Sequence, residues 1–110
     1  MSVAEENKVD GLALTEDNKG IVMLITDPLD WEDEYAHLLA LQRKINSYID
    51  FYESKQYLEI YKEKVIKYFI IEIHFLYKPT INALNFLAQV KKMGIIVKIS
   101  EGNDDLHENL

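Results

Sequence analysis

The chain has 110 residues, 48% of them hydrophobic and 28% charged, with a formal net charge of −7. This composition is typical of one globular domain and excludes a disordered chain. Because there is no cysteine, disulfides and thiolate metal sites are excluded. No uncharged apolar run approaches the roughly 18 residues that a membrane helix needs. The N-terminal sequence MSVAEENK lacks the basic and apolar regions of a signal peptide, so we expect a cytoplasmic protein that does not associate with membranes.

The charged residues are unevenly distributed along the chain. Residues 1–54 hold 12 acidic and 4 basic side chains, residues 55–100 hold 3 and 8, and residues 101–110 hold 4 and none. An acidic chain is poorly suited to neutralise phosphates, so nucleic acid is not an expected partner. An acidic surface instead attracts a basic protein.

The first 26 residues predict a loose N-terminus followed by a β-hairpin. Residues 1–8 are polar, and the apolar runs VDGLALT (9–15) and IVMLIT (21–26) are joined by EDNKG. Asp, Asn and Gly between two such runs are typical of a hairpin turn. Because IVMLI is apolar at every position, we expect it to form a central strand.

The next segment, DPLDWEDE (27–34), holds five carboxylates and precedes a helical pattern. Apolar residues recur at helical spacing from Trp31, which predicts a helix that ends near Glu53. Asp30 is the expected N-cap, with Asp33 at the third helical position as in a capping box. An acidic first turn complements the helix dipole, so most of this cluster has a structural explanation.

The remaining segments predict strands and a second helix. QYLEIY (56–61) predicts a short strand, and VIKYFIIEIHFLY (65–77) predicts a long one whose odd positions form an apolar face. Thr80 is the expected cap of a second helix that ends before Gly94. The last strand is IIVKI (95–99).

Together these elements predict a single α+β domain over residues 9–100, followed by an acidic mobile tail over residues 101–110. The expected fold is two-layered, with a mixed or antiparallel sheet of four to five strands and two helices on one face, in the order β-β-α-(β)-β-α-β. Few elements remain to cover the second face of the sheet. A half-apolar open face of this kind favours a dimer or partner surface.

Two groups of residues could carry chemistry, and each also has a simpler structural interpretation. One narrow helical face holds Asp30, Asp33, Glu34 and His37. Carboxylates and an imidazole one turn apart can bind zinc, but no second histidine-rich segment supports a metal site, so we expect none. Glu72 and His74 lie two positions apart on a strand. The carboxylate could orient the imidazole for acid–base chemistry, or the two could form an exposed polar pair.

Nucleophile and phosphate-binding motifs are missing from the sequence. There is no cysteine and no G-x-S-x-G motif, and the four glycines are scattered rather than clustered in a P-loop or a dinucleotide fingerprint. We therefore expect neither an enzyme nor a bound cofactor.

Two surfaces could bind a partner. Carboxylates and exposed tyrosines on one face of the first helix would suit a basic protein, since tyrosine is enriched in binding hot spots. The alternative is that these tyrosines cover the edge of the core. The predicted docking face consists of Asp30, Asp33, Glu34, His37, Tyr48 and Tyr52. The predicted interface on the second face of the sheet consists of Tyr68, Ile70, His74 and Leu76.

Three segments carry a family resemblance, namely DPLDW (27–31), LQRKINSYIDFYES (41–54) and YKPT (77–80). Over about residues 7–99 the chain resembles a small bacterial family catalogued as a domain of unknown function. The segment EIYKEKVIK (59–67) departs from the polar, glycine-containing loop expected there. The resemblance implies a bacterial cytosolic origin and supplies no catalytic residue.

These observations leave three hypotheses. The first is a non-enzymatic protein-binding module, in its most specific form an immunity-type protein that neutralises a toxin by docking on it. Small size and acidity favour this hypothesis, and such pairs are among the tightest known. The second is a structural homodimer without a substrate. The third is a small-ligand or metal-binding protein that uses Asp33, His37 or the pair of Glu72 and His74.

Overall fold

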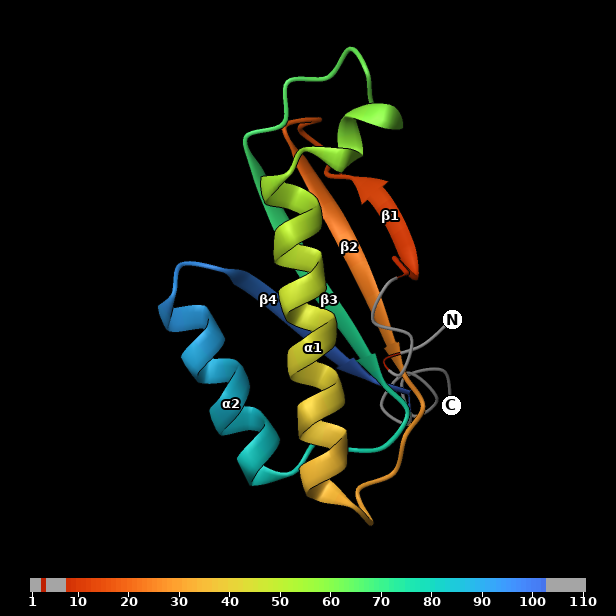
Figure 1. Ribbon diagram of the computed structural model, residues 1–110, viewed down its shortest axis with the longest axis vertical. Coiled ribbons are helices and arrows are strands. Elements are labelled where there is room, and N and C mark those ends of the chain that lie inside the picture. Colours follow the sequence, from red (N-terminus) through yellow and green to blue (C-terminus); the bar gives the residue numbers. More distant parts are fainter. Residues whose placement is uncertain (1–2, 4–7, 103–110) are drawn as a thin grey trace.

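A four-stranded sheet with two helices packed on one face forms the body of the protein (Figure 1). The computed structural model describes residue 3 and residues 8–102. The strands are β1 (Gly11–Leu14), β2 (Gly20–Asp27), β3 (Tyr68–Phe75) and β4 (Ile96–Glu101). The helices are α1 (Glu34–Glu53), α2 (Ile81–Lys92) and the short 3-10 helix η1 (Gln56–Glu59).

The sheet is mixed, with strand order β1-β2-β3-β4. β1 and β2 form the predicted antiparallel hairpin, whereas β2 pairs parallel with β3 and β3 pairs parallel with β4. Each parallel pair is joined through a helix. Right-handed crossovers that step the same way across a sheet place their helices on one face, and Figure 1 shows α1 and α2 side by side in front of the sheet. The predicted α+β fold is confirmed.

The core lies between the sheet and the helices. Because strand side chains alternate between the two faces, every second residue of the two central strands is buried under the helices. These residues are Ile21, Met23, Ile25, Ile71, Ile73 and Phe75. Leu41 and Ile45 of α1 and Leu87 and Val90 of α2 belong to the same core cluster. The interior position predicted for IVMLI is confirmed, since β2 lies between β1 and β3.

Residues 56–61 do not form the predicted strand. Gln56–Glu59 is a 3-10 helix, and its buried Tyr57 stacks on Tyr52 with ring centroids 5.4 Å apart. Lys55, at φ 61°, turns the chain after α1. Because Tyr57 is anchored against the end of α1, this segment packs on a helix instead of pairing with β3, and the described sheet has four strands.

Helix α1 begins later than predicted. Its N-cap is Asp33, whose Oδ1 accepts a hydrogen bond from Ala36 N at 3.1 Å. Asp30 Oδ1 instead accepts one from Glu32 N at 3.1 Å, in a turn that precedes the helix. Aspartate is favoured in both settings, so the sequence alone does not separate them.

Helix α2 begins and ends as predicted. Thr80 Oγ1 accepts a hydrogen bond from Ala83 N at 3.1 Å, and Gly94 follows the helix at φ 88°. Ile81 and Leu84, although apolar, are exposed. The residues that α2 buries are Ala83, Leu87 and Val90.

Parts of the predicted termini lie outside the described residues. These are positions 103–110 of the predicted mobile tail and all of the loose N-terminus 1–8 except residues 3 and 8. Glu101, assigned to the tail from sequence, is the last residue of β4. Within the part of the chain that the structure describes, no helix is both long enough and apolar enough to cross a membrane.

Candidate functional site

A buried histidine–aspartate pair lies where β2 ends and α1 begins. His37 Nε2 lies 2.6 Å from Asp27 Oδ2, and His37 Nδ1 lies 2.9 Å from the carbonyl oxygen of Asp30. Asp27 Oδ1 accepts a hydrogen bond from Leu29 N at 3.2 Å. The side chains of His37 and Asp27 are 2% and 0% exposed. The pair therefore ties the carboxyl end of β2 to the first turns of α1.

The hydrogen bonds engage both ring nitrogens of His37. A carbonyl oxygen only accepts, so His37 Nδ1 donates to Asp30. His37 Nε2 shares a second hydrogen bond with Asp27 Oδ2. Burial raises the pKa of Asp27, and the hydrogen bond with His37 opposes this rise. Because both ring nitrogens are engaged, this arrangement suits a structural tie better than a general base, which must reach a substrate proton.

Trp31 covers the pair. Its ring stacks on the imidazole of His37, with centroids 3.6 Å apart and 16° between the ring planes. Its Nε1 donates to the carbonyl oxygen of Tyr77 at 3.5 Å, and its ring centroid lies 6.1 Å from that of Phe75. Trp31 thus joins the β2–α1 connection to the end of β3 and shields the histidine.

A second buried polar network lies under the middle of α1. Lys44 Nζ lies 3.0 Å from Asp10 Oδ1, and it also donates to the carbonyl oxygen of Lys8. Asp10 Oδ2 accepts a hydrogen bond from Thr26 N at 2.9 Å. The side chains of Lys44 and Asp10 are 0% and 1% exposed. A buried charge is tolerated when it is paired and hydrogen-bonded, and this pair meets both conditions.

Tyr48 extends the network toward the sheet. Its hydroxyl accepts a hydrogen bond from Asp10 N at 2.8 Å and donates one to the carbonyl oxygen of Leu24. Burial raises the pKa of Tyr48, so the phenol stays protonated and keeps this donor. The network therefore joins α1 to β2 and to the segment before β1.

The predicted docking face of α1 is divided between the core and the surface. His37 and Tyr48 are buried, and Tyr52 is half-buried, with its ring centroid 4.4 Å from that of Phe69. The residues that remain at the surface are Asp30, Asp33 and Glu34. Glu34, His37, Tyr48 and Tyr52 belong to α1, whereas Asp33 is its N-cap and Asp30 precedes it. The tyrosines are not both exposed, and the alternative that they cover the core agrees with the buried Tyr48 and the half-buried Tyr52. A binding role for the acidic residues stays a prediction.

The same burial separates the residues considered as metal ligands. His37 points to Asp27 rather than toward Asp33 and Glu34. Across residue 3 and residues 8–102, no group of three or more His, Asp or Glu side chains is placed to hold a metal ion.

The second face of the sheet mixes apolar and polar side chains. Ile70 is buried and Tyr68 is half-buried, whereas His74 and Leu76 are exposed. His74 Nε2 lies 2.8 Å from Glu72 Oε2, so these two residues form the pair expected from their spacing. Leu76 follows the end of β3. The four residues of the predicted interface therefore do not make one apolar patch, and their role between two copies stays a prediction.

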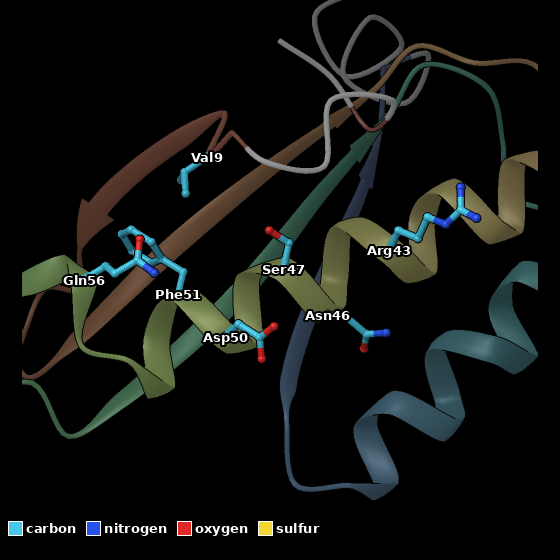
Figure 2. A pocket seen from close by; sticks show the side chains of 7 residues that line it. All are labelled: Val9, Arg43, Asn46, Ser47, Asp50, Phe51 and Gln56. Atoms are coloured by element: carbon cyan, nitrogen blue, oxygen red, sulfur yellow. The ribbon is translucent and has the colours of Figure 1, made fainter.

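A hollow with a volume of about 430 Å³ lies along α1 (Figure 2). Its lining residues are Val9, Arg43, Asn46, Ser47, Asp50, Phe51 and Gln56. In Figure 2 the polar ends of Arg43, Asn46 and Asp50 are spread along the helix and point in different directions. They do not converge on one place, as the polar groups of a ligand site do.

A different surface, at the carboxyl ends of β2 and β3, combines acids with large apolar side chains. The exposed apolar side chains there are Leu29, Tyr35, Leu76, Tyr77, Ile81 and Leu84. The carboxylates are Asp30, Glu32, Asp33 and Glu34, beside one base, Lys78. We call these residues the strand-end surface. Tyr35 is 77% exposed and Ile81 is 73% exposed, which is unusual for side chains of this size.

The two helices meet at the strand-end surface. Asn82 Nδ2 donates to Glu34 Oε1 at 3.0 Å, and hydrogen bonds from Thr80 and Asn82 lower the pKa of Glu34. Tyr35 follows Glu34 in the sequence, and Ile81 precedes Asn82. The contact therefore holds the most exposed apolar residues of both helices at one end of the molecule, with a charged carboxylate beside them.

Sequence reasoning missed Asp10 and Asp27 as the partners of buried polar residues. A signal was present, because His37, Lys44 and Tyr48 recur at helical spacing within an apolar stripe. Polar side chains at core positions need hydrogen-bond partners. Aspartates on either side of the hairpin strands were the available candidates.

Comparison with known proteins gives one family and no functional relative. The chain matches a family of unknown function (DUF6572) over residues 1–100. No curated protein and no solved structure gives a significant match. This match supports the resemblance to a family of unknown function that DPLDW and YKPT indicated. The chain belongs to that family.

Proposed function

We propose that the chain is a non-enzymatic, protein-binding module of the bacterial cytoplasm that docks a basic protein through the strand-end surface. The observation that carries this proposal is the gathering of exposed apolar side chains at one end of the molecule. Six of the twelve large hydrophobic side chains that are exposed among the described residues belong to it. Exposed apolar clusters with a polar surround mark interaction sites.

The composition of this surface favours a protein partner. Tyr35 and Tyr77 supply aromatic rings of the kind enriched in binding hot spots. Four carboxylates lie among the apolar side chains against the single base Lys78. Charges of one sign at a rim raise the association rate and select partners of the opposite sign. The partner's matching surface would therefore carry lysine or arginine around an apolar centre.

The buried polar groups support a non-enzymatic role. His37 and Lys44, which could take part in catalysis if they were accessible, are buried and hydrogen-bonded inside the fold. Their partners Asp27 and Asp10 are likewise engaged with backbone groups. An immunity-type protein, which occupies the surface of a toxin, is the specific form of binding module that small size and acidity favour.

The proposal is tested by affinity capture with the full chain as bait, followed by mass spectrometry and a titration of the purified captured protein. The baits are wild type, Tyr35→Ala and Val65→Ala. Val65 is a matched control because it is 73% exposed and lies in the loop before β3. We expect a basic protein that binds wild type and the control equally, loses binding to Tyr35→Ala and dissociates as salt is raised.

The proposal fails if Tyr35→Ala retains the captured protein in full, or if wild type retains only further copies of itself. The second result would instead favour a homodimer.

A further inference from the structure

An apolar groove runs between α1 and α2 and begins at the strand-end surface. Tyr35, Leu38, Leu39 and Gln42 of α1 form one wall, and Phe86 of α2 forms the other, around a volume of about 260 Å³. Figure 1 shows the two helices starting close together and separating along their length. The groove is the space that this divergence leaves near their first turns.

The groove exists because α1 carries more apolar surface than the sheet can cover. The side chains that it turns toward the sheet include Leu41, Ile45 and Tyr48, all buried. Leu38 and Leu39 lie beside this stripe and remain partly exposed, and Tyr35 is almost fully exposed. In an isolated helix–sheet layer such positions are normally polar, so the wider apolar arc indicates a further contact.

The size of the groove argues against a small molecule. Ligand pockets usually have volumes of about 300–1,000 Å³ and enclose most of the ligand, whereas this groove is smaller and open. It matches one or two apolar side chains of a partner. A groove between two helices is the usual receptor for an amphipathic helix, which inserts residues spaced by three or four positions.

The charged side chains beside the groove indicate the sign of the charge that a partner should carry. At its starting end, Glu32 and the N-cap Asp33 precede α1, and Glu34 is its first residue. The exposed polar residues of α2 along the other wall, Asn82, Asn85 and Gln89, are uncharged. Arg43, Lys91 and Lys92 lie toward the far end. An anionic membrane surface is disfavoured at the acidic end, where a basic partner is favoured.

We propose that this groove receives the apolar face of a basic amphipathic helix, with the basic residues of that helix over the acidic start of α1. The inference rests on the proposed protein-binding function and specifies the chemistry of the partner. The expected anchor is a leucine, methionine or phenylalanine seated between Leu39 and Phe86.

A model peptide tests the groove directly. The probe is an 18-residue helix of leucine and lysine at amphipathic spacing, compared with a scrambled peptide of the same composition and with a glutamate-for-lysine version. Isotope-labelled full chain is titrated with each peptide and followed by amide chemical shifts. We expect the amphipathic basic peptide to bind at least tenfold more tightly than either control, a difference of about 1.4 kcal/mol. The largest shifts should fall on Tyr35, Leu38, Leu39, Gln42 and Phe86.

Two matched variants keep the test independent of folding. Gln42 is exposed and lines the groove, so Gln42→Trp should fill it without disturbing the core. Gln89 is exposed on α2 and does not line it. We expect Gln42→Trp to lose at least tenfold in affinity for the amphipathic basic peptide, about 1.4 kcal/mol, and Gln89→Trp to change it by less than about twofold.

Equal binding of the scrambled peptide, shifts confined to other surfaces or no binding would overturn the groove proposal. Binding of the captured natural partner to the variants distinguishes failure of the groove proposal from failure of the proposed function. A captured protein that is lost by Tyr35→Ala but retained in full by Gln42→Trp would leave the binding module standing and remove the groove as its receptor.

Discussion

His37 Nε2 lies 2.6 Å from Asp27 Oδ2 beneath the ring of Trp31. This contact explains why an acidic segment separates a buried strand from a helix. Asp27 ends β2, shares a hydrogen bond with His37 and accepts one from the backbone N–H of Leu29 in the following turn. Asp33 caps the helix, while the remaining carboxylates stay at the surface. The cluster DPLDWEDE thus divides into a buried tie, a helix cap and part of the strand-end surface.

The first prediction concerns the pH dependence of stability. Burial raises the pKa of Asp27 above the ordinary value of 3.8, so the folded state holds its proton to higher pH than the unfolded state. The resulting stabilisation is complete below pH 3.8 and is lost as the pH rises through the raised pKa. Asp27→Asn mimics the protonated carboxyl and removes this titration.

Urea denaturation at a series of pH values checks this prediction. The free energy of unfolding of wild type, relative to Asp27→Asn, should decrease from pH 4 upward. An increase over that range would contradict the assignment, because it would require a lowered pKa of Asp27.

The second prediction concerns the buried pair of Lys44 and Asp10. Lys44→Met leaves the carboxylate of Asp10 buried without its counter-charge, which should reduce the free energy of unfolding by about 3–5 kcal/mol. The double variant Lys44→Met, Asp10→Asn removes both charges and keeps an oxygen that can accept from Thr26 N. It should recover part of the loss. The pair would not be a buried ion pair if Lys44→Met cost less than about 1 kcal/mol, the range of exposed pairs.

The third prediction concerns the hydroxyl of Tyr48. Tyr48→Phe keeps the packed ring but removes a group that accepts from Asp10 N and donates to the carbonyl oxygen of Leu24. Leaving these backbone groups unpaired should cost about 1–3 kcal/mol. The measurement is the midpoint of chemical denaturation at constant m-value. Tyr35→Phe, at an exposed position on the same helix, is the control and should change the midpoint little.

A considerable part of this fold was predictable because it depends on local patterns. The continuous apolar run IVMLI and the alternation in residues 69–75 identified the two central strands, and Thr80 with Gly94 marked the ends of α2. The positions of His37 and Tyr48 were not predictable in the same way. Their spacing places them on one helical face, but only tertiary packing determines whether that face meets water or the sheet.

The candidate site was harder to predict from sequence than the fold. Burial of Lys44 depends on Asp10, which lies 34 residues away in the chain, and no local pattern relates the two. The strand predicted for residues 56–61 was wrong for a related reason. Their apolar content suits a strand, but the stacking of Tyr57 on Tyr52 fixes them against α1. In both cases the local sequence allowed more than one structure, and a tertiary contact determined which one formed.

The fourth prediction concerns the turn after α1. Lys55 has φ 61°, in the left-handed region that costs a residue with a side chain about 1–2 kcal/mol. Glycine adopts this conformation freely but loses more entropy on folding. Lys55→Gly should therefore raise the free energy of unfolding by up to about 1 kcal/mol. Thermal denaturation measures the effect, and Gln56→Gly, one position later, should destabilise instead.

The claim that the strand-end surface binds a protein is tested most directly by calorimetric titration of the captured partner with two variants of α2 and its C-cap. Ile81→Lys changes an apolar residue of the strand-end surface that is 73% exposed, and Met93→Lys changes one that is 71% exposed at the other end of the helix. Each adds one positive charge. The account predicts that Ile81→Lys weakens binding at least tenfold, about 1.4 kcal/mol, while Met93→Lys leaves the affinity within about twofold of wild type. Equal affinity of the two variants, or a greater loss with Met93→Lys, would contradict it.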